Sequence, residues 1–135
     1  MEKIIYPAIF HPEEEAGGYS VVFPDLQGCI TEGDTLYEAV EMAEDALGIY
    51  LSTLKEDKEK APEPSDPSEI KLNGKDFISL VEWDEVAYMK KTDNRAVKKT
   101  LTIPSWMDKL AKERNINFSN VLQNALRREL NIESN

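Results

Sequence analysis

Apolar residues in the first third of the chain fall into three short runs. They occupy Ile4 to Phe10, Tyr19 to Phe23 and a shorter stretch around Cys29. Glycine, proline and acidic residues separate the runs, a pattern typical of strands joined by turns. We predict a β-hairpin with a loose polar connection, followed by a third short strand.

The apolar spacing changes to steps of three and four residues after Gly33, which predicts one long amphipathic helix. Thr35, followed by Glu38 three residues later, fits a capping box at its start. Acidic residues occupy the opposite side, so the helix is expected to cover one face of the sheet. Its predicted apolar stripe comprises Leu36, Ala39, Val40, Ala43, Leu47, Tyr50, Leu51 and Leu54.

A charged, proline-containing segment from Lys55 to Asp66 then predicts a loop. Asp76 to Trp83 is expected to form another strand, and Asp84 to Lys91 a short helix or turn. Residues 1–89 therefore form a predicted α+β domain, an antiparallel sheet with one long helix.

The rest of the chain, residues 90–135, has a different pattern. Val97, Leu101 and Ile103 alternate with Lys98, Thr100 and Thr102, which predicts a strand that Pro104 ends. Two amphipathic helices are expected to follow. Ser105 would cap the first, which Asn115 stops, and Asn117 would cap the second, with Ile116 and Val121 forming a hydrophobic staple.

A single strand with two short helices has no strand partner of its own, so this segment is expected to be an obligate dimer. Pairing each strand with its symmetry mate gives an antiparallel ribbon that fits the DNA major groove. The outward side of the ribbon would carry Lys98, Thr100 and Thr102. Backbone amides of Phe118 and Ser119 would anchor a phosphate. The predicted dimer core contains Leu101, Ile103, Leu122 and Leu126.

The charge differs sharply between the two segments. Residues 1–89 hold 6 basic against 21 acidic residues, a net of −15, whereas residues 90–135 hold 10 against 5, a net of +5. This asymmetry suggests a basic partner for the front and a polyanion for the back.

The composition argues against most hydrolase chemistries. One cysteine, Cys29, and one histidine, His11, provide neither a zinc set nor the usual nucleophile and base. We expect Cys29 to be a small buried hydrophobe and His11 to be solvated. No cofactor, metal ligand set or catalytic residue is expected. The chain has no apolar run long enough for a membrane span and no signal-peptide pattern at its start, so we expect a cytoplasmic protein.

Two sequence runs resemble a known family. VKKTLTIPSWMDKLAKERNINFSNVLQNALRREL is similar to a ribbon-helix-helix DNA-binding domain, and IYPAIF, GGYSVVFPDLQGCITEGDTLYEA and the PEPSD loop resemble the N-terminal domain of HicB antitoxins. The resemblance implies a truncated RNase-H-like front domain. It also implies an antitoxin, not an enzyme, that binds the mRNA-cleaving HicA toxin, assembles as a homodimer or higher even-numbered oligomer and represses its own operon.

Two other functions are consistent with the residues themselves. A small metal-dependent nuclease would use front carboxylates, of which Asp25, Glu32 and Asp34 are the nearest candidates. A free-standing repressor would carry a ligand sensor in front of its DNA-binding tail. The exposed side of the tail strand could also be the plain surface of an ordinary dimer.

Overall fold

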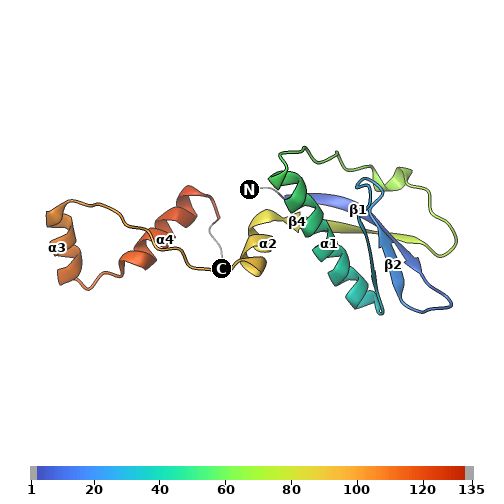
Figure 1. The fold of residues 1–135 in the computed structure, drawn as a ribbon, viewed down its shortest axis with the longest axis horizontal. Helices are drawn as coiled ribbons and strands as arrows, with labels where there is room; N and C mark the ends of the chain where they lie inside the picture. Colours follow the sequence, from blue (N-terminus) through green and yellow to red (C-terminus); the bar gives the residue numbers. More distant parts are fainter. Residues whose placement is uncertain (1–2, 133–135) are drawn as a thin grey trace. The chain divides into compact units, whose positions relative to one another are not determined.

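The chain divides into two compact units, Met1–Asp93 and Asn94–Asn135, which we call the front unit and the tail unit. A computed structural model describes residues 3–132 (Figure 1). The predicted boundary after Met89 falls inside a helix, α2 (Glu85–Thr92), and the front unit extends to Asp93. The outer ends of the two predicted domains, residues 1–2 and 133–135, lie outside the described residues.

The front unit contains a four-stranded antiparallel sheet. Its strands are β1 (Lys3–Pro12), β2 (Tyr19–Val22), β3 (Ile30–Gly33) and β4 (Phe77–Asp84), in the spatial order β3-β2-β1-β4. The predicted hairpin and the later strand are confirmed. Gly17 and Gly18 both have a φ of 78°, a conformation that glycine adopts without steric cost, and this allows the β1–β2 turn to close.

One long helix, α1 (Leu36–Glu56), lies against this sheet (Figure 1). The predicted start is confirmed, because the Thr35 hydroxyl accepts a hydrogen bond of 3.1 Å from the Glu38 backbone N–H. At the other end, Lys58 has a left-handed φ of 57°, and the Glu59 N–H donates to the Leu54 carbonyl at 2.8 Å. This hydrogen-bonded ending is a Schellman motif. The helix thus includes Lys55 and Glu56, which the sequence assigned to the following loop.

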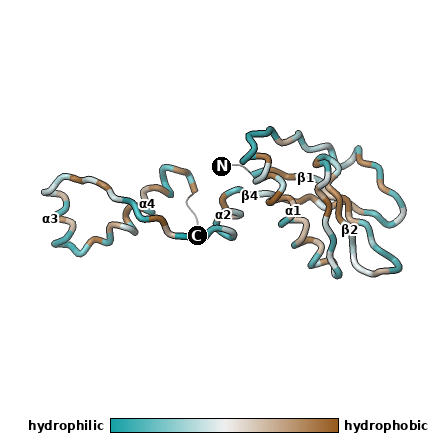
Figure 2. The backbone as a smooth tube through the Cα atoms, in the orientation of Figure 1, coloured by the Kyte–Doolittle hydropathy of each residue, from teal (hydrophilic) through white to brown (hydrophobic). Residues whose placement is uncertain are grey.

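Side chains from the sheet and from α1 form the core between them. Tyr6, Ala8 and Phe10 of β1 are fully buried, and the apolar strands appear in brown in Figure 2. The α1 stripe is narrower than predicted, since Leu36 and Val40 are exposed. Ala39, Ala43, Leu47 and Leu51 supply its buried face. The front unit is therefore an α+β fold with one helix layer on one face of its sheet.

The loop after α1 is tied to the rest of the front unit by hydrogen bonds. The Tyr6 hydroxyl donates to the Pro62 carbonyl at 2.5 Å, and the Ser65 N–H donates to the Asp25 carboxylate at 2.9 Å. A short 3-10 helix, η1 (Pro67–Glu69), follows. These bonds give a proline-rich segment a fixed course back to β4.

Helix α2 packs on α1 at the end of the front unit. Asp84 caps it by accepting a hydrogen bond from the Ala87 N–H at 3.1 Å. The buried Glu85 pairs with Lys55 of α1. A Cβ on Gly48 would lie 2.4 Å from a ring carbon of Tyr88, so the absence of a side chain there allows the two helices to approach.

The tail unit comprises an extended segment, residues 94–104, followed by α3 (Ser105–Glu113) and α4 (Phe118–Glu129). The predicted strand over Val97 to Ile103 does not form in the single described chain. A strand requires hydrogen bonds to a neighbouring strand, and within residues 94–132 the chain offers none. Both predicted helices are confirmed, and Asn115, with a φ of 54°, ends the first.

Candidate functional site

The extended segment carries the side chains predicted to contact DNA. Lys98, Thr100 and Thr102 are all exposed and lie at alternate positions. Leu101 lies between the two threonines and Ile103 follows the second one. Their surfaces are 62% and 42% exposed. Large apolar side chains left open to water on an extended segment indicate a surface that another element covers.

The start of α3 differs from the prediction. Ser105 is the first helical residue and Pro104 is the N-cap, with no side-chain hydrogen bond to the helix. Pro104 has extended angles, φ −57° and ψ 141°, as N-cap residues do, and its ring offers no acceptor for the first helical amides.

The start of α4 agrees with the prediction. The Asn117 side chain accepts a hydrogen bond of 3.1 Å from the Asn120 N–H. Phe118 and Ser119 then supply the first two backbone N–H groups of the helix. No carbonyl within the helix can accept a hydrogen bond from these groups, because each would need a helical residue four positions earlier. Helix N-termini of this kind attract anions through these amides and the helix dipole.

Neither helix of the tail unit has a buried residue. Leu126 is 47% exposed, and Trp106 and Leu110 are also exposed. Leu122 is half-buried. The predicted dimer-core residues therefore lie on an apolar surface that the single tail unit leaves largely open to solvent.

Basic side chains accompany this apolar surface. Arg127 and Arg128 lie in the last turn of α4 and were absent from the predicted site. Arg127 donates to the Asn124 side chain at 2.9 Å, and Lys112 pairs with Asp108 at 2.9 Å within α3. The sequence pointed to these arginines only through the positive net charge of residues 90–135, and a net charge does not identify individual residues.

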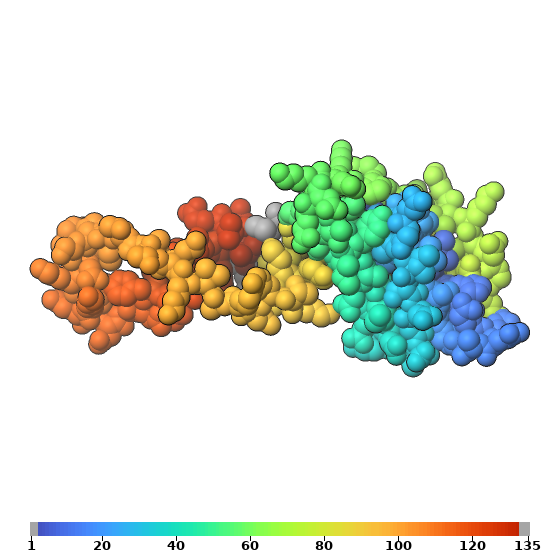
Figure 3. All heavy atoms as spheres, viewed as in Figure 1, coloured from blue at the N-terminus to red at the C-terminus, as the bar shows by residue number. Residues whose placement is uncertain are grey.

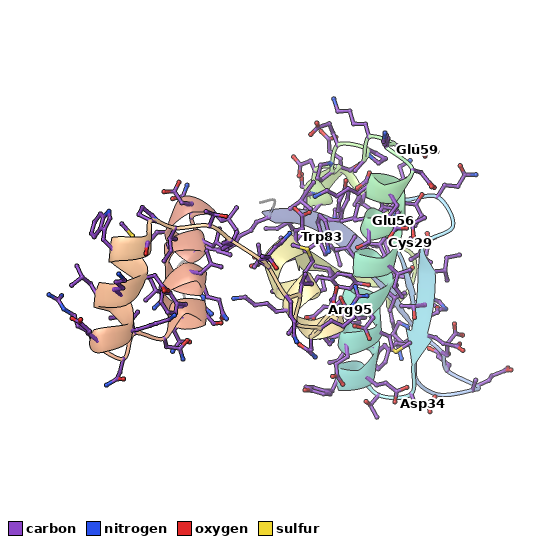
Figure 4. All side chains as sticks on the ribbon, turned by 60° about the vertical axis from the view of Figure 1, so that its left-hand side comes forward. Cys29, Asp34, Glu56, Glu59, Trp83 and Arg95 are labelled. Carbon is purple, nitrogen blue, oxygen red and sulfur yellow. The ribbon has the colours of Figure 1, made fainter. Side chains whose placement is uncertain are left out.

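The front carboxylates considered as metal ligands have other surroundings. Asp25 accepts hydrogen bonds from both the backbone N–H and the hydroxyl of Ser65. Glu32 is exposed on β3, and Asp34 lies just before α1, at the end of the helix opposite Glu56 (Figure 4). Within residues 3–132, no group of three acidic, histidine or cysteine side chains is arranged to hold a metal ion.

Cys29 is buried as predicted, with 4% of its surface exposed. Its Sγ lies 3.8 Å from the Ala46 carbonyl oxygen, and burial raises the pKa of the thiol. A thiol that stays protonated is a poor nucleophile.

His11 is exposed but, contrary to prediction, not merely solvated. Its Nδ1 lies 2.5 Å from the Asp76 carboxylate. This hydrogen bond is the main reason that the pKa of His11 is raised. The partner could not be predicted because Asp76 lies 65 positions away, just before the neighbouring strand β4.

A cleft of about 610 Å³ opens beside Trp83, between the start of β1, the end of α1 and the loop that follows. Three lysines and two glutamates line it together with apolar side chains, so no single charge dominates. The Trp83 indole Nε1 is buried without a hydrogen-bond partner among the described residues. Nothing in this lining selects a particular cofactor.

A family model described as the HicB-like antitoxin of bacterial toxin-antitoxin systems matches residues 6–126, which include both units. The chain belongs to this family of HicB-like antitoxins. The predicted resemblance to HicB antitoxins is thereby confirmed.

Relatives of this chain cover it to different extents. Antitoxin HicB 1 of Photorhabdus laumondii is 51% identical over 64 residues, which are 47% of this chain and 41% of that protein. This chain thus matches less than half the length of that curated relative. An uncharacterized 14.9 kDa protein of Haemophilus phage HP1 is 35% identical over 105 residues, 76% of this chain and 74% of that one.

A solved structure gives a likeness over nearly the full length. The structure is described as a toxin-antitoxin complex from Streptococcus pneumoniae, and its matching chain is 32% identical. The match covers 95% of this chain and 99% of that chain, with a TM-score of 0.60.

Among the described residues of this chain, no helix is long and apolar enough to cross a membrane.

Proposed function

We propose that this chain neutralises a small basic HicA-type mRNA-cleaving toxin with its front unit and represses its own operon with its tail unit. The observation that carries the proposal is the division of charge, −15 over residues 1–89 and +5 over residues 90–135, within a chain of the HicB-like antitoxin family. Opposite charges speed the encounter with each partner and disfavour the wrong one. The chain itself performs no chemistry.

The acidic surface of the front unit supports the toxin half of the proposal. Exposed carboxylates of Glu38, Glu41 and Glu44 on the outer side of α1, which lies at the surface in Figure 3, add to the long-range field that draws a basic partner toward the front unit, whichever face that partner finally contacts. Covering a nuclease's active site and its RNA-binding surface is sufficient to block it. The front sheet would correspond to the truncated RNase-H-like fold of this family, used here for binding.

The tail unit supports the DNA half. We assign it a ribbon-helix-helix arrangement in which two copies pair their extended segments and bury Leu101, Ile103, Leu122 and Leu126. Lys98, Thr100 and Thr102 then lie on the outer side of the ribbon, where they reach base edges in the major groove. Amides of Phe118 and Ser119 bind a flanking phosphate.

Operator binding by the full chain tests the DNA assignment. The triple variant Lys98→Ala, Thr100→Ala, Thr102→Ala should lose at least about tenfold in operator affinity, because each lost base contact costs about 1–3 kcal/mol. Lys98→Ala alone should reduce the slope of log affinity against log salt by about one if it contacts a phosphate. Lys71→Ala, an exposed lysine of the front unit, is the matched control. Unchanged affinity in the triple variant would refute the placement.

Toxin neutralisation tests the other half. The full chain should stop RNA cleavage by the HicA-type toxin encoded in the neighbouring reading frame, in an equimolar mixture. A front fragment, residues 1–93, should do the same while losing operator binding. Its association rate should fall with salt, since exposed charges are screened beyond about 10 Å at 0.1 M ionic strength. Neutralisation by the tail fragment alone would contradict this division of labour.

A further inference from the structure

The face of the sheet that α1 does not cover is apolar at its centre. Strand register places Ile30, Val22, Ile9 and Ile78 in one row that crosses all four strands. Pro7 and Leu80 form the next row, in which Pro7 is fully buried and Leu80 is exposed. Ile30, Leu80, Ile5 and Val22 are 63%, 55%, 46% and 38% exposed. We call this set of seven residues the open face.

An apolar open face is unusual for an antiparallel sheet with helices on one side only. Such sheets normally alternate apolar residues toward the core with polar residues toward water. In β1 the core-facing Tyr6, Ala8 and Phe10 instead alternate with Ile5, Pro7 and Ile9. Strands apolar on both sides are typical of sheets covered on both faces, and contiguous exposed apolar patches mark interaction sites.

Carboxylates border the open face on two sides. Beyond the four-strand row, the next row holds Glu32, Ser20 and His11, and His11 pairs with Asp76. At the other end, Glu82 lies directly opposite Ile5, and the row beyond them holds Lys3 and Asp84, which are 3.8 Å apart.

The borders therefore hold four carboxylates, Glu32, Asp76, Glu82 and Asp84, against two basic groups, Lys3 and His11. An apolar centre with an acidic rim is complementary to a partner that presents an apolar patch ringed by lysine and arginine.

We infer that the open face is where the basic toxin docks, an inference that rests on the proposed function. Leu80 and Ile30, the most exposed members, lie on the two edge strands and fit apolar pockets of the toxin. The acidic rim pairs with the toxin's basic residues. A second copy of this chain fits less well, since apposing two such faces would bring rims of the same sign together.

Two exposed apolar residues of similar size allow a matched test in the full chain. Leu80→Lys places a charge on the open face, whereas Ile49→Lys places the same charge on the exposed side of α1, where Ile49 is 60% exposed. Binding of a catalytically inactive HicA-type toxin is measured by calorimetry, with circular dichroism as a check on folding. Leu80→Lys should weaken binding by about 10- to 100-fold, because the complex loses a leucine side chain that the toxin would bury and gains a cation that repels the toxin. Ile49→Lys should change it less than about threefold, the level expected of an exposed charge.

Ile30→Lys on the opposite edge strand is a second variant, should Leu80→Lys fail to fold. Normal toxin binding by folded Leu80→Lys and Ile30→Lys would overturn the inference while leaving the proposed function intact. If only Ile49→Lys weakened toxin binding, the docking surface would be α1 and not the open face, and this result would also overturn the inference. Loss of self-association or of operator binding, with toxin binding intact, would show that a second copy or the chain's own tail covers the face. Failure of the unaltered chain to bind toxin would instead reject the proposed function.

Discussion

The front and tail units differ in where their apolar residues find partners. The front unit encloses a core of its own, with Tyr6, Phe10 and Leu47 fully buried between sheet and helix. The tail unit buries no residue in either helix, although Leu101, Leu110 and Leu126 are as apolar as any core residue. Burial of apolar surface is the main favourable contribution to folding, so the front unit should fold alone and the tail unit should fold with a partner.

The largest expected difference is a dependence on concentration. A fragment of residues 1–93 should unfold at the same temperature over about a hundredfold dilution. The unfolding temperature of a dimer would fall by several degrees over that range. A fragment of residues 94–135 should sediment as a dimer and unfold on dilution. A tail fragment that stays folded as a monomer would contradict the paired-ribbon assignment.

Leucine truncations should sharpen the comparison. Leu47→Ala removes a fully buried side chain and should lower the free energy of unfolding of the front fragment by about 2–5 kcal/mol. Leu122→Ala or Leu126→Ala should cost the tail dimer a similar amount, and operator binding should weaken indirectly. Urea titrations of each fragment measure these values. If Leu126→Ala instead costs well under about 1 kcal/mol, the value for an exposed position, that residue is not in a dimer core.

Helix endings provide a smaller contrast between the units. Lys58 at the end of α1 and Asn115 at the end of α3 both adopt left-handed backbone angles. Because lysine is strained there, Lys58→Gly should stabilise the front unit by about 0.5–1 kcal/mol. Asparagine tolerates this conformation better, so Asn115→Gly should change the tail by less. Thermal denaturation of the two variants makes the comparison, and a destabilised Lys58→Gly would contradict it.

The smallest expected effect is a pH dependence confined to the front unit. The His11 pKa is raised above 6.5 chiefly by its hydrogen bond to Asp76. The pair therefore contributes its full stability below the unfolded pKa and loses it as pH rises through the folded pKa. His11→Gln should remove this part of the pH dependence, measured by urea unfolding between about pH 5 and pH 8, the range in which histidine titrates. The tail unit has no histidine and should lack this dependence.

Local patterns predicted the elements of the front unit well. Short apolar runs bounded by turn residues located β1, β2 and β4, and the pair Thr35 and Glu38 located the start of α1, because both signals depend on neighbouring residues. The His11–Asp76 pair and the contact of Tyr88 with Gly48 join distant parts of the chain, which one sequence does not reveal.

The candidate sites were predicted less completely. The apolar run of β1 signalled a strand but did not reveal that Ile5 and Ile9 lie on the face of the sheet that α1 does not cover. That property depends on the number of helices and on the strand order. In the tail, the alternation over residues 97–103 predicted a strand that one chain cannot make, since its hydrogen-bonding partner must come from outside.

The anchoring of α2 has an evolutionary consequence. Glu85, Tyr88 and Lys91 fix this helix to α1, and the core cluster of the front unit ends with it. A recombination event that joined a different tail after Asp93 would leave every one of these contacts in place. We therefore expect lineages in which similar front units carry unrelated tails, so that the binding specificities proposed for the two units can be inherited separately.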